Sequence, residues 1–231
     1  MRTSRTLLAV VAGAVLTPAP ALAAPVDDGP VLGAAGVTLN GTAAVTTVSD
    51  RPVLALTGGG YKQAGSAWAS RKVDLRTSFD VEFTAHLRPE GGADGIALVV
   101  QADGPRALGG WGGGLGYRGI RNSVAVEFDT HHNAPDPGGE HVAVTLNGRP
   151  DTHVASAAVP QPLRGEPFRV RVRFDSGQNL EVYAGTELVL RQPVDLVGTG
   201  GAETAWVGFT GATGLVTAEQ HVYDWSVTVP S

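Results

Sequence analysis

One acidic stretch of the chain carries side chains that could hold metal ions. It runs from Val124 to His141. Its metal-binding candidates are Glu127, Asp129, His131, Asn133, Asp136 and His141. If the stretch begins as a strand, its first three candidates share one face, with neighbouring Cα atoms on that face about 6.7 Å apart. Val126 and Phe128 then point into the core. The loop from residue 132 to 140 can fold back so that the three later candidates meet this row.

The donor groups of this stretch fit two neighbouring ions. Ca²⁺ takes roughly 6–8 oxygen ligands at about 2.3–2.6 Å, and Asp129, Asn133, Asp136 and a loop carbonyl would supply many of them. Glu127 and His141 remain, and carboxylates with one imidazole suit a smaller ion such as Mn²⁺. Because a carboxylate has two oxygens, Asp129 and Asp136 could contact both ions. The alternative is an exposed acidic loop without metal, in which His141 contacts solvent at the end of a strand.

Short apolar runs separated by turn-forming residues must position this stretch. The runs are Val37–Leu39, Val53–Leu56, Val73–Leu75, Phe79–Leu87, Ile96–Val100, Val124–Phe128, Val142–Leu146, Phe168–Phe174, Leu180–Tyr183, Glu187–Leu190, Trp206–Phe209 and His221–Val229. Glycine accounts for 32 of the 231 residues, which favours turns over long helices. The pattern predicts an all-β sandwich or a closed barrel.

The clearest strand is predicted at Phe168–Phe174, where apolar residues alternate with arginines. A period of two places the apolar side chains on one face and Arg169, Arg171 and Arg173 on the other. Turn-forming residues then connect this strand to Leu180–Tyr183, which predicts an antiparallel hairpin. We interpret the arginine row as a solvated sheet face opposite acidic residues, with a polyanion-binding stripe as the alternative.

Length, charge and cysteine content limit the possible functions. The 231 residues suit one domain, and a hydrophobic share of 42% is enough for a core. The 17 basic and 22 acidic residues give a formal net charge of −5, which removes the electrostatic basis for binding nucleic acid. Since the chain has no cysteine, any metal must be held by oxygen and imidazole ligands.

The beginning of the chain has the pattern of a secretory signal peptide. Arg2 and Arg5 precede an apolar run from Leu7 to Leu16, and small residues follow up to Ala23. The run is too short to cross a bilayer, which takes about 20 residues, so no membrane span is expected. We therefore predict a signal peptide at 1–23, a flexible leader at 24–35 and a folded domain at 36–231. The expected location is secreted and extracellular.

Four motifs together resemble the legume-type (L-type) lectin family. Besides the acidic stretch, they are Gly91–Gln101, Gly112–Gly116, and Val207–Gly214 with Asp224–Ser226. The first of these resembles the family's Ala-Asp-Gly loop, the second its glycine loop, and the third its last strands. The resemblance covers roughly 37–229 and implies a concanavalin A-like jelly-roll β-sandwich of two antiparallel sheets. The Gly, Ala and Arg content suggests a bacterial secreted member.

The resemblance also implies a sugar site organised by Ca²⁺ and a transition metal such as Mn²⁺. Asp94 would accept hydrogen bonds from sugar hydroxyls, after a cis Ala93–Asp94 bond. Asn133 would direct its carbonyl oxygen to Ca²⁺ and its NH₂ group to the sugar. Gly113, or failing that Gly114, would donate a backbone N–H, because only a residue without Cβ permits the close approach. In this scheme the metals only pre-organise the polar groups.

The sequence departs from the family pattern around this site. His131 stands where the family usually has an aromatic ring against the sugar, and imidazole offers less surface. The loop from 214 to 221, which contains Leu215, is short, and in the family it helps to select the monosaccharide. Trp111 is either a structural aromatic or a stacking platform for a sugar. The predicted carbohydrate-binding residues are Asp94, Gly113, Gly114, His131, Asn133 and Leu215.

These observations favour a non-catalytic lectin, whose partners are glycans or glycoconjugates and which could form a homo-oligomer. One alternative is a secreted adhesion or interaction domain that has the fold without sugar binding. A second is a glycoside hydrolase on a similar sandwich, because Glu127-Phe128-Asp129 resembles the start of a Glu-x-Asp-x-Glu catalytic row. That row, however, needs a Glu as its acid/base, where this chain has His131.

A zinc hydrolase is disfavoured by the distribution of histidines. No His-Glu-x-x-His sequence occurs. The remaining histidines, His86, His153 and His221, are scattered along the chain, so none of them is assigned to a metal.

Overall fold

The computed structural model describes residues 36–89, 91–133 and 136–229. The predicted signal peptide at 1–23 and the leader at 24–35 lie outside the described residues and stay predictions. Within the described ranges, no helix is long and apolar enough to span a membrane.

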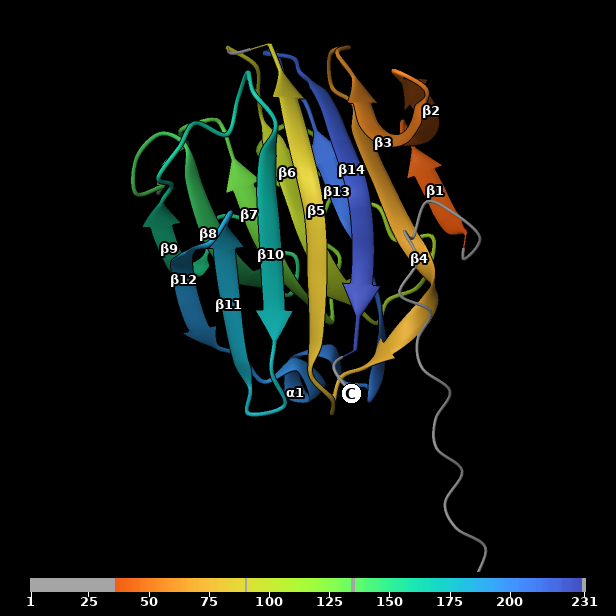
Figure 1. Cartoon of the computed structure of the whole chain (residues 1–231), viewed down its shortest axis with the longest axis vertical. Coiled ribbons are helices and arrows are strands. Elements are labelled where there is room, and N and C mark those ends of the chain that lie inside the picture. Colours follow the sequence, from red (N-terminus) through yellow and green to blue (C-terminus); the bar gives the residue numbers. More distant parts are fainter. Residues whose placement is uncertain (1–35, 90, 134–135, 230–231) are drawn as a thin grey trace, which may run out of the picture.

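The described residues form two antiparallel sheets of seven strands each, packed as two layers (Figure 1). The first sheet consists, in spatial order, of β1 (Val37–Gly41), β4 (Ala64–Asp74), β13 (Thr204–Ala212), β6 (Gly95–Gln101), β7 (Ser123–Asp129), β8 (His141–Leu146) and β9 (His153–Ala158). The second sheet consists of β12 (Glu187–Pro193), β11 (Asn179–Ala184), β10 (Phe168–Phe174), β5 (Phe79–Arg88), β14 (Glu219–Thr228), β3 (Arg51–Gly58) and β2 (Ala44–Val48). The only helical elements among the described residues are η1 (Gly112–Gly114) and α1 (Leu196–Gly200). The predicted all-β jelly-roll sandwich is confirmed.

The arginine-rich strand has the predicted orientation. In β10 the apolar residues are buried, and the arginines between them face outward. Arg171 lies opposite Glu82, and Arg173 lies opposite Asp80 and Glu181 on the two neighbouring strands. Cross-strand pairs of opposite charge stabilise a sheet by about 0.2–1 kcal/mol each. The row is therefore charge-matched within its own sheet, and the predicted hairpin with β11 is confirmed.

The main core lies between the two sheets. Phe83 of the second sheet packs edge-on against Phe128 and Phe209 of the first, with ring centroids 5.6 and 4.7 Å away. Phe209 makes a similar contact with Trp225. Edge-to-face pairs of this kind add about 0.5–1.5 kcal/mol beyond the burial of their area. As predicted, Val126 and Phe128 face this core.

The outer face of the first sheet is buried as well. A second cluster forms there from Trp68, Ala97, Val99, Leu115, Tyr117, Ile120 and Ala125. Leu115, Tyr117 and Ile120 belong to the long connection between β6 and β7, which folds back over the sheet. Glu127 and Asp129, which form an acidic row, are on the same face of β7 as Ala125. The connection therefore covers the acidic row as well. Glu127 is therefore only 1% exposed, although it faces away from the main core.

Three strands were missed or displaced in the sequence prediction. The segments 44–48 and 153–158 form β2 and β9, which the sequence did not predict. The strand predicted at Val73–Leu75 is the end of β4, which begins at Ala64. These segments consist largely of Ala, Ser, Thr and Gly, which give little hydrophobic contrast. They pair through the backbone with neighbours that the local sequence does not reveal.

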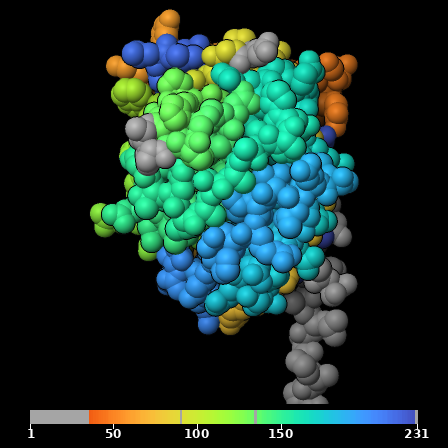
Figure 2. Space-filling view, turned by 90° about the vertical axis from the view of Figure 1, so that its left-hand side faces the viewer, coloured from red at the N-terminus to blue at the C-terminus, as the bar shows by residue number. Residues whose placement is uncertain are grey.

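The register of the first sheet brings five strand ends together. Residues Ala64, Ala212, Gly95, Asp129 and His141 lie side by side across five strands. The loops that follow or precede them therefore meet at one end of the sandwich, the upper end in Figure 1, where β3, β5 and β7 also end. Figure 2 views the molecule from the side of β9 and β12, where the green and blue segments adjoin.

Candidate functional site

Three of the predicted metal ligands converge at this end. Asp129 and His141 are direct partners in the β7–β8 ladder, so their side chains project from the same face. One ligand atom from each of Asp129, Asp136 and His141 lies within 4.8 Å of the other two. Residues twelve positions apart in sequence thus form one cluster, because the loop between the strands folds back as predicted.

Hydrogen bonds within the loop hold this arrangement. The backbone N–H of His131 donates to Oδ1 of Asp129 at 2.7 Å, and the N–H of Asn133 donates to Oδ2 of Asp136 at 2.6 Å. The N–H of Asp136 donates in turn to the carbonyl of Asn133 at 2.7 Å. Each aspartate therefore keeps its other oxygen available for a further partner.

His153 belongs to the cluster, contrary to its interpretation as a scattered histidine. Its Nε2 lies 3.4 Å from Oε2 of Glu127 and 3.8 Å from Oδ1 of Asp136. Glu127, His141 and His153 also form a group whose ligand atoms lie within 4.8 Å of one another. The sequence prediction missed His153 because it begins β9, a strand that was not predicted. The signal that could have found it is the weak alternation of His153–Ala158.

Two residues orient Glu127. The hydroxyl of Tyr117 donates to Oε1 of Glu127 and lies 2.7 Å from the hydroxyl of Thr145. All three side chains are at most 1% exposed. Tyr117 was not singled out in the sequence, since it comes from the connection between β6 and β7 rather than from the acidic stretch. Supporting hydrogen bonds of this kind fix a ligand's orientation at metal sites.

The cluster contains buried polar atoms without partners. Among the described residues, Oε2 of Glu127, Nε2 of His141 and Oδ2 of Asp94 have no hydrogen-bond partner. Nδ1 of His141 lies 2.9 Å from the carbonyl oxygen of Gly139. Because a carbonyl only accepts, Nδ1 carries the proton, which leaves the lone pair of Nε2 directed elsewhere. A buried polar atom without a partner costs about 1–3 kcal/mol, and a cation would satisfy the two atoms of Glu127 and His141.

Burial changes the acidity of the carboxylates. It raises the pKa of Asp129 from 3.8 to about 8, against the hydrogen bond from the His131 N–H, with the charges of Asp136 and Asp94 acting in the same direction as burial. Burial also raises the pKa of Glu127 well above its usual value, although the hydrogen bond from Tyr117 opposes it. Carboxylates gathered in this way need a positive charge to remain ionised together. The donor set and its electrostatics therefore fit a bound cation.

Asp94 is fixed next to the cluster. The Ala93–Asp94 peptide bond is cis, as the resemblance implies. The N–H of Asp94 donates to the carbonyl of Ala212 at 3.0 Å, and its own carbonyl accepts from the N–H and the hydroxyl of Thr130, both at 2.9 Å. Burial raises the pKa of the Asp94 carboxyl, whereas the charge of His131 and a backbone hydrogen bond from Gly214 lower it.

Glycines surround the side chains of Asp94 and Asn133. A Cβ on Gly214 would lie 3.2 Å from Oδ2 of Asp94, and one on Gly112 would lie 4.0 Å from the same atom. A Cβ on Gly113 would lie 3.2 Å from Oδ1 of Asn133. Because these positions are glycines, they place no side chain against the carboxylate of Asp94 or the amide of Asn133.

Gly113 and Gly114 differ in their surroundings. The N–H of Gly114 donates to the carbonyl of Trp111 at 3.2 Å, and a Cβ on Gly114 would meet the side chain of Arg118 at 3.1 Å. In the part of the chain that the structure describes, the N–H of Gly113 has no acceptor. Of the two predicted donors, only Gly113 therefore lies beside Asn133 with a free N–H.

The amide of Asn133 is turned differently from the orientation that the resemblance implies. Its Nδ2 donates to the carbonyl oxygen of His131 at 3.2 Å, so this end faces the loop. The reason is local, since the backbone oxygen of His131 needs a donor. A rotation of 180° about the last side-chain bond of Asn133 would exchange Oδ1 and Nδ2. The oxygen would then face the loop, as the resemblance implies, and the NH₂ group would lie beside Gly113.

Exposed side chains lie around Asp94, Gly113 and Asn133. Leu215 is 78% exposed and Trp111 is 53% exposed, with Nζ of Lys62 5.0 Å from the centre of the Trp111 ring. His131 is exposed too, and its ring does not belong to either group of candidate metal ligands among the described residues. Its carbonyl oxygen, rather than its imidazole, faces Asn133.

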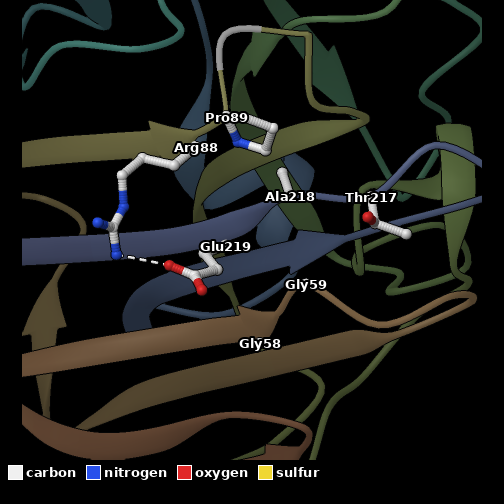
Figure 3. Close-up of a pocket in the computed structure, with 7 residues that line it drawn as sticks. All are labelled: Gly58, Gly59, Arg88, Pro89, Thr217, Ala218 and Glu219. Carbon is white, nitrogen blue, oxygen red and sulfur yellow. Dashed lines mark hydrogen bonds and ion pairs between the residues drawn. The ribbon is translucent and has the colours of Figure 1, made fainter.

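A separate hollow of about 380 Å³ lies at the same end of the sandwich (Figure 3). Its lining residues are Gly58, Gly59, Arg88, Pro89, Thr217, Ala218 and Glu219. Arg88 and Glu219 form an ion pair of 2.5 Å across adjacent strands, drawn as a dashed line in Figure 3. Because neither Asp94 nor Asn133 lines it, this hollow is distinct from the cluster.

Comparison with known proteins agrees with the geometry. The profile of the legume lectin β-barrel domain family matches residues 33–224. A seed lectin of Styphnolobium japonicum is 32% identical over 177 residues, which cover 68% of this chain and 58% of the relative. A lectin of Onobrychis viciifolia is 27% identical over 174 residues, covering 68% and 69%. The chain thus spans little more than half the length of the first relative.

A solved structure shows the same fold. Basic winged bean lectin, solved with Tn-antigen, superposes with a TM-score of 0.72 at 23% identity, covering 84% of this chain and 93% of the other. The described strands, the converging loops and the family profile lead to one assignment: the chain belongs to the legume lectin (L-type) family.

Proposed function

We propose that this protein is a secreted, metal-dependent lectin that binds glycans without cleaving them. Membership of a carbohydrate-binding family supports the general function. The observation that carries the finer proposal is the placement of Asp94 and Asn133, surrounded by glycines, directly beside a buried cluster of unpartnered metal-ligand atoms. Secretion rests on the predicted signal peptide at 1–23.

Polar groups from three loops would bind the sugar. Asp94 offers carboxylate oxygens as acceptors for hydroxyl groups, and Gly113 offers a backbone N–H as a donor. Asn133 completes the set with its amide. Trp111 and Leu215 are exposed next to these groups and can cover an apolar face of the ligand.

The predicted ions would fix these groups in place. Ca²⁺ would be held by Asp129, Asn133, Asp136 and the carbonyl oxygen of His131, and the transition metal by the carboxylates with His141. When bound, the ions would supply the positive charge that keeps Asp129, Asn133 and Asp136 in one arrangement. Asp94 depends on the residue that follows Asp129, because its carbonyl accepts hydrogen bonds from Thr130.

Burial argues against hydrolysis at the acidic row. Glu127, the first carboxylate of the sequence that resembles a catalytic row, is 1% exposed. Tyr117 occupies Oε1 of Glu127 from the side that the connection between β6 and β7 covers. A glycosidic oxygen must come within hydrogen-bond distance of its acid, and this burial prevents such an approach.

A glycan array with controlled metal content tests the proposal. Metal-stripped protein should gain several degrees in melting temperature when Ca²⁺ and Mn²⁺ are added, because ligands that bind only the native state stabilise it. The loaded protein should then give array signals that EDTA abolishes, and no reducing ends should be released. Stabilisation with a blank array would indicate an interaction domain instead, and release of reducing ends would indicate a hydrolase. Absence of both metal binding and sugar binding would refute the proposal.

A further inference from the structure

His153 supplies a second imidazole to the buried cluster. Its ring centroid lies 5.3 Å from that of His141, and its Nε2 lies 3.4 Å from Oε2 of Glu127. The side chain is only 11% exposed, so it sits inside the cluster rather than above it. No role in sugar binding follows from this position, because its ion-pair partners are Glu127 and Asp136 and not the predicted sugar-binding residues.

The atoms that face His153 are available as ligands. Oε2 of Glu127 and Nε2 of His141 belong to side chains only 1% exposed, and within the described ranges neither atom has a hydrogen-bond partner. Tyr117 holds the opposite oxygen of Glu127, and the carbonyl of Gly139 fixes the proton of His141 on Nδ1. One ligand atom from each of Glu127, His141 and His153 lies within 4.8 Å of the other two, which is close enough for one ion to contact all three.

We propose that His153 is a direct ligand of the transition-metal site, and that the two imidazoles make this site select Zn²⁺ or a similar borderline ion over Mn²⁺. The inference rests on the proposed function only in requiring an ion at this cluster. Without His153 the donors are carboxylates and one imidazole, a set that suits Mn²⁺. With it, Glu127, His141 and His153 form a nitrogen-rich set of the kind that binds Zn²⁺ in a tetrahedral site, with one position left for a carboxylate or water.

A purely structural role makes a different prediction. In that case His153 would only pair with Glu127 and Asp136, and its removal would change the binding of all divalent ions to the same extent. A ligand, in contrast, changes the ratio of affinities, because imidazole contributes more to Zn²⁺ than to Mn²⁺. The ratio of the two dissociation constants is therefore the quantity to measure.

The experiment compares the wild-type chain with His153→Ala and with His86→Ala as the matched control. His86 is a partly buried histidine of β5 that lies outside both candidate ligand groups. Each protein is stripped of metal, its melting temperature is recorded, and Zn²⁺, Mn²⁺ and Ca²⁺ are titrated separately against a competing chelator. Zinc K-edge X-ray absorption then counts the imidazoles on the bound ion. His153→Gln, which keeps the volume of the side chain, replaces His153→Ala if the alanine variant does not fold.

The proposal expects two imidazoles on Zn²⁺ in the wild type and one in the His153 variant. It also expects the affinity for Zn²⁺ to fall about 100-fold in that variant, and the affinity for Mn²⁺ about 10-fold or less. His86→Ala should match the wild type. An unchanged ratio, or a single imidazole in the wild type, overturns the inference and leaves the lectin proposal intact. If the wild type binds none of the three ions, the proposed metal dependence fails together with the inference.

Discussion

The hydroxyl of Tyr117 donates a hydrogen bond to Oε1 of Glu127, and this one contact joins the connection between β6 and β7 to the predicted metal cluster. The same hydroxyl lies 2.7 Å from Oγ1 of Thr145 on β8. Since Tyr117 is completely buried, water cannot replace either contact. The tyrosine therefore determines which oxygen of Glu127 remains available to an ion.

Tyr117→Phe should weaken binding of the transition metal. The change keeps the ring in the hydrophobic cluster on the outer face of the first sheet and removes only the hydroxyl that orients Glu127. Loss of such a supporting contact typically lowers metal affinity about 10–100-fold. A competitive chelator titration measures this. Tyr183→Phe is the control, because Tyr183 also donates to a carboxylate, Oε2 of Glu181, but on the other sheet. Equal metal affinities for the two variants would contradict the prediction.

Asp129→Ala and Asp94→Ala should separate metal binding from sugar binding. Asp129 is a predicted ligand of both ions and also anchors the N–H of His131, so its removal should abolish metal and glycan binding together. Among the described residues Asp94 belongs to neither group of candidate metal ligands, so its removal should abolish glycan binding alone. Elemental analysis and the glycan array are the two measurements. Retained glycan binding in Asp94→Ala would show that the sugar lies elsewhere.

Gly113→Ala should block the sugar site and leave the metals in place. The new Cβ would lie 3.2 Å from Oδ1 of Asn133, in the space that the ligand needs. Gly58→Ala is the matched control, since its Cβ would meet nothing within 4 Å. We expect at least a 10-fold loss of glycan affinity for the first variant, about 1.4 kcal/mol, with unchanged Ca²⁺ binding for both. Calorimetric titration with a glycan identified on the array checks this.

The stability of the protein should depend on pH in opposite ways with and without metal. The pKa of Asp129 is raised from 3.8 to about 8 in the folded chain, so the metal-free native state binds this proton more tightly than the unfolded state does. Its stability should therefore fall as pH rises from about 4 to about 8. Metal binding needs the deprotonated ligands, so the stabilisation by added ions should grow over the same range.

Melting curves at several pH values, with chelator and with added ions, provide the measurement. Asp129→Asn is the control for the metal-free protein. Because its amide does not titrate, the melting temperature of this variant should depend less on pH than that of the metal-free wild type. A melting temperature of the metal-free wild type that rises as steeply as that of the loaded protein would contradict the assignment of Asp129.

Local patterns in the sequence were sufficient for much of the fold. Alternation in Phe168–Phe174 predicts one buried face and one charged face, because side chains of a strand point to opposite sides. The same rule places Glu127 and Asp129 together on the face opposite Phe128. The order of the four motifs predicted the sandwich and the family, since both depend on spacing along the chain.

The remaining parts of the site depend on contacts between distant segments. His153 reaches Glu127 only because β9 pairs with β8, and a strand of small residues gives only a weak hydrophobic alternation to indicate that pairing. Tyr117 reaches it only because the connection between β6 and β7 covers the sheet. Gly113 differs from Gly114 by the conformation of one short turn. The sequence by itself determined which chemical groups are present and on which strand face they lie, and the tertiary structure decided which of them meet, because strand pairing and loop packing are set by the whole chain.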